Sequence, residues 1–233
     1  MGTGRNAWQA AMLATILVIT SNAMPQEAER TDGTAQRVLN PRRTSGILTE
    51  RLTRSQLKAW QSILEIALAE DGEGSPLYPG LSALYHQVDM SDYEIQIEIS
   101  TQRSTLRAVG LCRIERHTEG VPKEVVLIQL NLGMIDRAAA SELNRRADGL
   151  IPFVGLGKRE RYAEVLGHEL AHVVRLITDP GYRDLYRERQ ALADSRSDDV
   201  QTIGRLTRLI EKPAETAETE IWRELTAGVE PKL

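Results

Sequence analysis

Two histidines and a glutamate lie within one short apolar stretch, "VLGHELAHVVRLI", residues 165–177. The chain has four histidines in all, and two of them, His168 and His172, are four positions apart. On a helix this spacing corresponds to a turn of about 40°, so both imidazoles lie on one face and can converge on one ion. Zinc accepts two such nitrogens and keeps positions open for a further ligand and water. The spacing therefore predicts a zinc site.

Glu169 lies next to the first histidine and points about 100° away from it around the helix. This direction prevents Glu169 from joining the pair of ligands but lets it reach a water molecule on the metal. A metal ion lowers the pKa of such a water, and a carboxylate beside it can act as general base. We therefore predict that Glu169 is the catalytic residue.

The rest of this stretch is typical of a helix over residues 158–178, ended by "DPG" at 179–181. An apolar stripe lies roughly opposite the histidines and would pack on the core: Leu166, Leu170, Val173 and Ile177. The alternative is a pair of packing or surface histidines without metal. A chance HExxH pattern in so histidine-poor a chain is expected on the order of 1% of the time, which favours the metal site.

The motif "HELAH", residues 168–172, resembles that of the zincin metallopeptidases. The resemblance implies one zinc ion, a peptide or protein substrate, and a fold in which a backing helix and a small sheet precede the HExxH helix. The elements expected here follow a similar order. The expected fold class is α+β and zincin-like, with a backing helix and a small, mostly antiparallel sheet packed on the HExxH helix, followed by C-terminal helices.

The sheet is expected from three alternating runs, residues 92–100, 105–117 and 124–135, which predict a half-solvated antiparallel meander. A helix over residues 53–71 precedes them, and a short helix over 138–147 and an apolar loop over 149–157 follow. Cys112, the only cysteine, is expected to be a core thiol. A single cysteine excludes an internal disulfide and a zinc site built from thiolates.

The third metal ligand must come from elsewhere in the chain. Metzincins use a third histidine, but none follows His172, so the resemblance is to the gluzincins, which take a glutamate from a later helix. Pro213 is expected to start the last helix, in which Glu218 lies within the apolar stripe. Because a buried carboxylate needs a partner, Glu218 is the expected ligand and Glu215 the alternative. A solvated acidic first turn would also explain both.

Gluzincins commonly place a histidine or tyrosine where it stabilises the oxyanion. The available side chains are Tyr182, Tyr186, His86 and His117. Tyr182 and Tyr186 follow the motif closely, although stacked helical tyrosines are more often packing residues. The run at 125–133, "VVLIQLNLG", is the candidate edge strand for pairing with an extended peptide, and an interior strand is its alternative interpretation.

The N-terminus resembles a signal peptide over residues 1–23, with Arg5, an apolar run at 7–20 and small residues at 21–23. An uncleaved anchor or a buried helix is the alternative. Residues 24–50 are expected to form a flexible leader or linker, and residues 51–233 the metallopeptidase domain. The protein is thus expected to be exported, periplasmic or secreted, without a stable membrane span after cleavage. With 29 basic against 33 acidic residues, we expect no nucleic-acid partner.

The expected function is that of an exported zinc-dependent metallopeptidase. Two alternatives remain open at this point: a zinc hydrolase that does not act on peptides, and a non-catalytic, zinc-stabilised envelope or interaction module. Glu169 favours chemistry, because a purely structural zinc needs no base beside it.

Cleavage after Ala23 would give a mature chain that begins at Met24, because Ser21 and Ala23 are small enough for signal peptidase. N-terminal sequencing of protein recovered from the envelope or the medium measures this directly. Intact Met1 in a membrane fraction would replace cleavage with anchoring.

Overall fold

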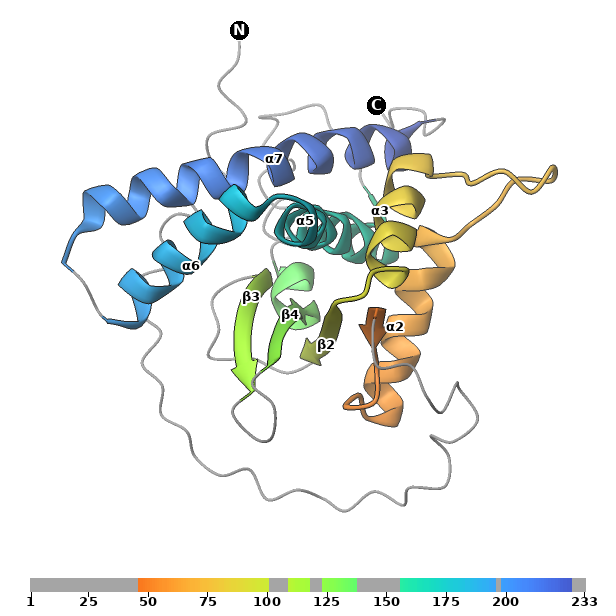
Figure 1. The fold of residues 1–233 in the computed structure, drawn as a ribbon. Helices are drawn as coiled ribbons and strands as arrows, with labels where there is room; N and C mark the ends of the chain where they lie inside the picture. The colour runs from red at the N-terminus through yellow and green to blue at the C-terminus, as the bar shows by residue number, and fades with distance from the viewer. Residues whose placement is uncertain (1–45, 101–108, 118–122, 138–155, 196–197, 228–233) are drawn as a thin grey trace, which may run out of the picture.

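The computed structural model describes residues 46–100, 109–117, 123–137, 156–195 and 198–227, which form one α+β arrangement (Figure 1). The predicted signal peptide, most of the leader, the helix at 138–147 and nearly all of the loop at 149–157 lie outside the described residues. The elements, in chain order, are β1 (Gly46–Leu48), α2 (Arg54–Ala67), α3 (Pro79–Asp89), β2 (Glu94–Ser100), β3 (Gly110–His117), β4 (Lys123–Asn131), α5 (Lys158–Thr178), α6 (Pro180–Asp194) and α7 (Val200–Thr226).

The first predicted helix is confirmed as α2, and its start is fixed by a capping box. The side chain of Thr53 accepts a hydrogen bond from the backbone of Gln56, and the Gln56 side chain accepts one from the backbone of Thr53. Two short elements nearby differ from expectation. Residues 46–48, assigned to the leader, form β1, and α3, which begins at Pro79, lies in a segment for which no helix was expected.

The sheet is mixed, with the strand order β1-β2-β4-β3. β1 pairs with β2 and β2 with β4 in parallel, and only β3 and β4 pair antiparallel. The predicted antiparallel meander is therefore wrong. Alternation of apolar and polar residues shows which side chains share a face, but it does not show which strand lies next to which.

β4 lies between β2 and β3, so the predicted edge strand is an interior strand, as in its alternative interpretation. Residues 125–128 are buried consecutively, on both faces of β4. Such a continuous apolar run is typical of strands covered on both sides. The edge strands are β1 and β3.

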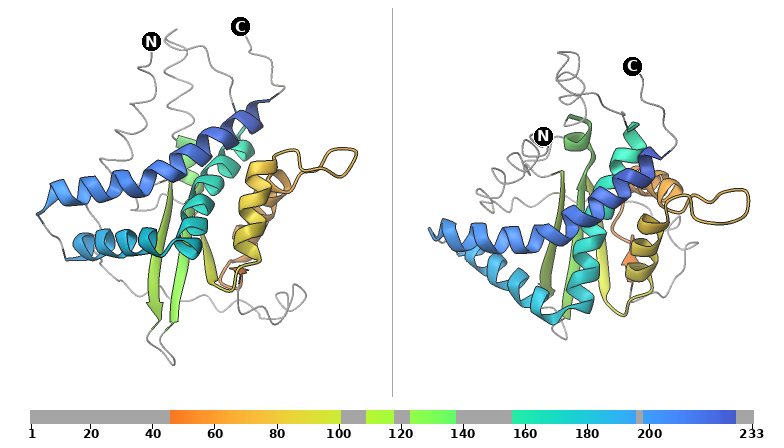
Figure 2. Two further views of the ribbon diagram at one scale, coloured as in Figure 1. Left: turned by 45° about the horizontal axis from the view of Figure 1, so that its top comes forward. Right: turned by 90° about the horizontal axis from the view of Figure 1, so that it is seen from above.

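The motif helix α5 passes through the middle of the molecule. In Figures 1 and 2, it lies between the sheet on one side and α7 on the other, and the remaining helices flank it. Every residue from Arg161 to Val173 is buried, which places both histidines and all of the apolar stripe except Ile177 away from water. None of the helices in the described parts of the chain is long and apolar enough to cross a membrane.

α7 continues through Pro213, where the sequence predicted a new helix to begin. A proline inside a helix lacks the N–H that would bond four residues back, here to Leu209, and usually breaks the helix. Buried side chains lie on both sides of it, Ile210 and Ala214 nearest, and Ile221 and Leu225 beyond. We infer that this packing outweighs the lost hydrogen bond.

α7 approaches α5 closely at Gly167, the residue before the first motif histidine. A Cβ atom at this position would lie 2.3 Å from Cδ1 of Ile221 and 3.1 Å from Cδ1 of Leu81. Further along α7, the carboxylate of Glu224 accepts a hydrogen bond of 2.8 Å from the backbone of Gly80, at the start of α3. These contacts fix where α7 crosses α5.

Ile221→Ala is expected to lower the free energy of unfolding by about 2–5 kcal/mol, because it leaves a cavity at the crossing of α5 and α7. Leu209→Ala, on the exposed side of the same helix, is the matched control and should change it by less than about 0.5 kcal/mol. Urea unfolding followed by circular dichroism measures both. Equal effects of the two substitutions would show that the crossing does not depend on Ile221.

Candidate metal centre

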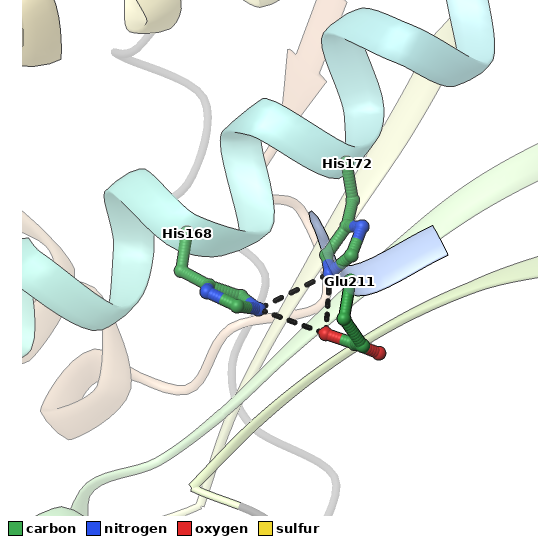
Figure 3. A group of neighbouring side chains, drawn as sticks. All are labelled: His168, His172 and Glu211. Carbon is green, nitrogen blue, oxygen red and sulfur yellow. Dashed lines mark hydrogen bonds and ion pairs between the residues drawn. The ribbon is translucent and has the colours of Figure 1, made fainter. Parts of the chain in front are cut away.

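Three side chains from two helices converge on one point (Figure 3). His168 and His172 come from α5 and Glu211 from α7. The two Nε2 atoms are 3.1 Å apart, and Oε2 of Glu211 is 3.3 Å from each of them. Among the described residues, this is the group whose donor atoms could hold a metal ion.

The size of this triangle fits zinc. Zinc binds nitrogen at about 2.0–2.1 Å and carboxylate oxygen at about 2.0–2.2 Å in tetrahedral geometry, which separates neighbouring ligand atoms by about 3.3–3.4 Å. The observed separations of 3.1 and 3.3 Å are close to this value. Two imidazole nitrogens and one carboxylate oxygen are also a donor set that zinc accepts.

The other nitrogen of each imidazole has its own partner. Nδ1 of His168 lies 2.9 Å from Oε2 of Glu218, and Nδ1 of His172 lies 2.6 Å from the hydroxyl of Tyr182. A carboxylate only accepts, and the Tyr182 hydroxyl donates to the backbone oxygen of Ile210, 2.9 Å away. Both Nδ1 atoms are therefore assigned as the donors, which leaves both Nε2 lone pairs facing the centre of the triangle.

This arrangement brings the carboxylates of Glu211 and Glu218 and the nitrogen lone pairs of two buried histidines close together. Burial lowers the pKa of His168, but hydrogen bonds to the carboxylates of Glu211 and Glu218 outweigh it and raise that pKa well above its usual value. Burial lowers the pKa of His172. Burial opposes ionisation of Glu211, yet hydrogen bonds from both histidines lower its pKa. The centre thus favours a positive charge, which a proton or a metal ion can supply.

The third position of the triangle belongs to Glu211, and not to Glu218, which the sequence favoured, or to Glu215. Because α7 is continuous, Glu211 and Glu218 are seven residues apart on one helix, about 20° short of two full turns, and share a face. Glu211 reaches the inner nitrogens and Glu218 the outer nitrogen of His168. Glu215 is not a member of the converging group.

The expected helix began at Pro213, so its apolar stripe favoured Glu218 and Glu215 over Glu211. Glu211 was one of many acidic residues after the motif and had no apolar stripe of its own to single it out. If the helix is continued through Pro213, Glu211 falls one turn before Glu215 and two turns before Glu218, on the face that Glu218 occupies. This helical spacing is the pattern that could have identified it.

Glu169 is buried beside the edge strand β3, with 3% of its surface exposed. A Cβ atom on Gly110 of β3 would lie 2.3 Å from Oε1 of Glu169, so only glycine leaves room for the carboxylate there. Burial is the main cause that raises the pKa of Glu169, to about 8 in the metal-free chain, while the charge of His168 lowers it. No pattern in the amino-acid sequence distinguishes Gly110 from the other glycines.

The tyrosine hydroxyls proposed to stabilise an oxyanion are engaged elsewhere. That of Tyr182 bridges His172 and Ile210, and that of Tyr186 donates to the backbone oxygen of Cys112. Both tyrosines are buried, in agreement with the packing role that was their alternative. His86 is exposed on α3, and the side chain of His117 lies outside the described residues. Cys112 is buried, as expected.

Comparison with known proteins returned no counterpart: no family model, no curated protein and no solved structure matches the chain.

Glu211→Ala is expected to weaken zinc binding more than Glu218→Ala, because it removes a ligand atom. Loss of the partner that orients His168 typically costs about 10–100-fold in metal affinity, which is the effect expected for Glu218→Ala. Glu215→Ala is the matched control on the same helix and should bind zinc like the wild type. Competition with a chromophoric chelator measures all three affinities, and a larger effect of Glu218→Ala or Glu215→Ala would remove Glu211 from the ligand set.

Proposed function

We propose that the protein is a zinc-dependent peptidase in which His168, His172 and Glu211 hold the metal and Glu169 is the general base. The observation that carries the proposal is the triangle of donor atoms with a buried glutamate between the two histidines on the same helix. A structural zinc site is closed by four protein ligands, whereas a catalytic site has three and an open position. Three converging donors support the catalytic kind.

Zinc bound there would polarise a substrate carbonyl and make a water molecule more acidic. Glu169 would take the proton from this water at a carboxylate oxygen as the water attacks, and would then deliver the proton to the departing amine. Tyr182 and Glu218 would hold the two imidazoles in the orientation in which Nε2 faces inward. Burial of both histidines and Glu169 excludes bulk water and strengthens these interactions.

Of the three side chains that form the triangle, Glu211 is the one most exposed to solvent, so a substrate would reach the centre beside it. Its side chain is 23% exposed, whereas the side chains of His168 and His172 are 5% and 4% exposed. A substrate carbonyl would therefore approach the centre beside Glu211, where it is least buried, and meet Glu169 next to His168 on α5. This arrangement favours a hydrolase over a non-catalytic module.

Glu169→Gln should retain zinc and the fold but lose hydrolysis by about 10²–10⁴-fold, because glutamine has nearly the same shape and cannot accept the proton. Cleavage of a diverse peptide library, with and without a chelator, measures the activity, and elemental analysis measures the zinc. Glu160→Gln, in the first turn of the same helix, is the control and should cleave like the wild type.

Two results would contradict the proposal. One is cleavage that a chelator does not inhibit, or that Glu169→Gln performs as fast as the wild type. The other is a zinc-loaded wild type that cleaves no member of the library, which would favour the non-catalytic module.

A further inference from the structure

The outer edge of β3, on the side away from β4, passes directly beside the candidate base Glu169. The backbone N–H of Asn131 in β4 donates to the carbonyl of Val109, so Val109 faces β4. In an antiparallel pair the direction alternates from residue to residue, and the N–H and C=O groups of Gly110, Cys112 and Ile114 consequently point outward. An extended peptide added to this edge would bond to these groups.

Side chains of α6 already occupy part of that edge. The hydroxyl of Tyr186 donates to the carbonyl of Cys112. The amide of Gln190 bonds twice to Ile114: its Oε1 accepts from the N–H at 3.2 Å and its Nε2 donates to the C=O at 2.8 Å. The Gln190 amide thus stands where the peptide group of a further strand would stand.

Several contacts anchor α6 in this position. Tyr186 is buried, its ring lies 6.2 Å from that of His172, and the guanidinium of the buried Arg189 lies 5.9 Å from its ring. α6 also follows α5 directly, after Asp179. The side chains that cover Cys112 and Ile114 are therefore part of the packed structure.

At Gly110 the edge is different. Its outward N–H and C=O have no α6 partner among the hydrogen bonds of the described residues, and it is the residue against which the carboxylate of Glu169 lies. Within the described ranges, the covered part of the edge therefore begins at Cys112, two residues from Gly110 and the candidate base.

We propose that Tyr186 and Gln190 close the substrate edge on one side of the reacting bond, so that the enzyme cleaves peptides near a chain end. This inference rests on the proposed peptidase function and specifies its substrate class. Residues in a strand advance by about 3.3 Å each, so a peptide paired at Gly110 has room for about two residues before it meets the Tyr186 hydroxyl. An internal bond of a long chain would require peptide on both sides.

Mapping of products tests the substrate class. The zinc-loaded wild type is incubated with unstructured peptides of about twenty residues, and mass spectrometry locates each early cleavage. Cuts within about two residues of one terminus, always the same terminus, are expected, and blocking that terminus with a bulky group should abolish them. Early cuts distributed through the interior would overturn the inference while supporting the peptidase function.

Variants of α6 test which side chains set the limit. Tyr186→Ala, alone and combined with Gln190→Ala, should raise the share of cuts more than two residues from the end at least about tenfold, since the covered part of the edge is opened. Arg187→Ala removes an ion pair to Glu124 of β4 but leaves the edge covered, and should keep the wild-type pattern. An unchanged pattern in a folded double variant would overturn the role of these side chains.

Hydrogen exchange tests the closure without any substrate, on the whole chain. The N–H of Ile114 should be protected in the wild type and exchange about 10–100-fold faster in Gln190→Ala, whereas Arg187→Ala should leave it protected. Wild-type exchange at the rate of an exposed amide would overturn the closure. Because this measurement needs no activity, it separates failure of the closure from failure of the proposed function.

Discussion

The crossing of α5 by α7 is the constraint on which the centre depends. Gly167 lets Ile221 approach α5 one residue before the first histidine, and this closeness brings a carboxylate of α7 within 3.3 Å of both imidazoles. A larger residue at position 167 would push the helices apart by more than the tolerance of a metal site, in which ligand distances vary by about 0.2 Å. The contact that packs the core also sets the coordination geometry.

The local part of the centre could be predicted from the sequence, because it depends on helix geometry alone. The positions of His168 and His172 on one face, and of Glu169 beside them, follow from a turn of about 100° per residue. The structure confirms the helix over residues 158–178 and buries three of the four residues of its apolar stripe, Leu166, Leu170 and Val173. The helix that begins after Thr53 could be predicted for the same reason, because the residues that form it are neighbours in the chain.

The remaining part depends on contacts between distant segments, which no local pattern determines. His168 and Glu218 are 50 positions apart, and the choice between Glu211 and Glu218 as ligand depends on how far α7 slides along α5. The parallel pairing of β2 with β4 is a choice of neighbour of the same kind. Pro213 misled the prediction because its local preference to begin a helix is weaker than the packing of the buried residues around it.

The bridging hydroxyl of Tyr182 has a consequence for how the chain assembles. It ties a histidine of α5 to the backbone of α7 next to Glu211, so the centre joins two helices that α6 separates in the chain. A cation held by these ligands would link α5 to α7 and would be released when the two helices separate on unfolding. By mass action, a cation at a hundred times its dissociation constant would add about 2.7 kcal/mol to the stability of the folded chain. The supply of metal would then decide how long the protein survives as well as whether it reacts.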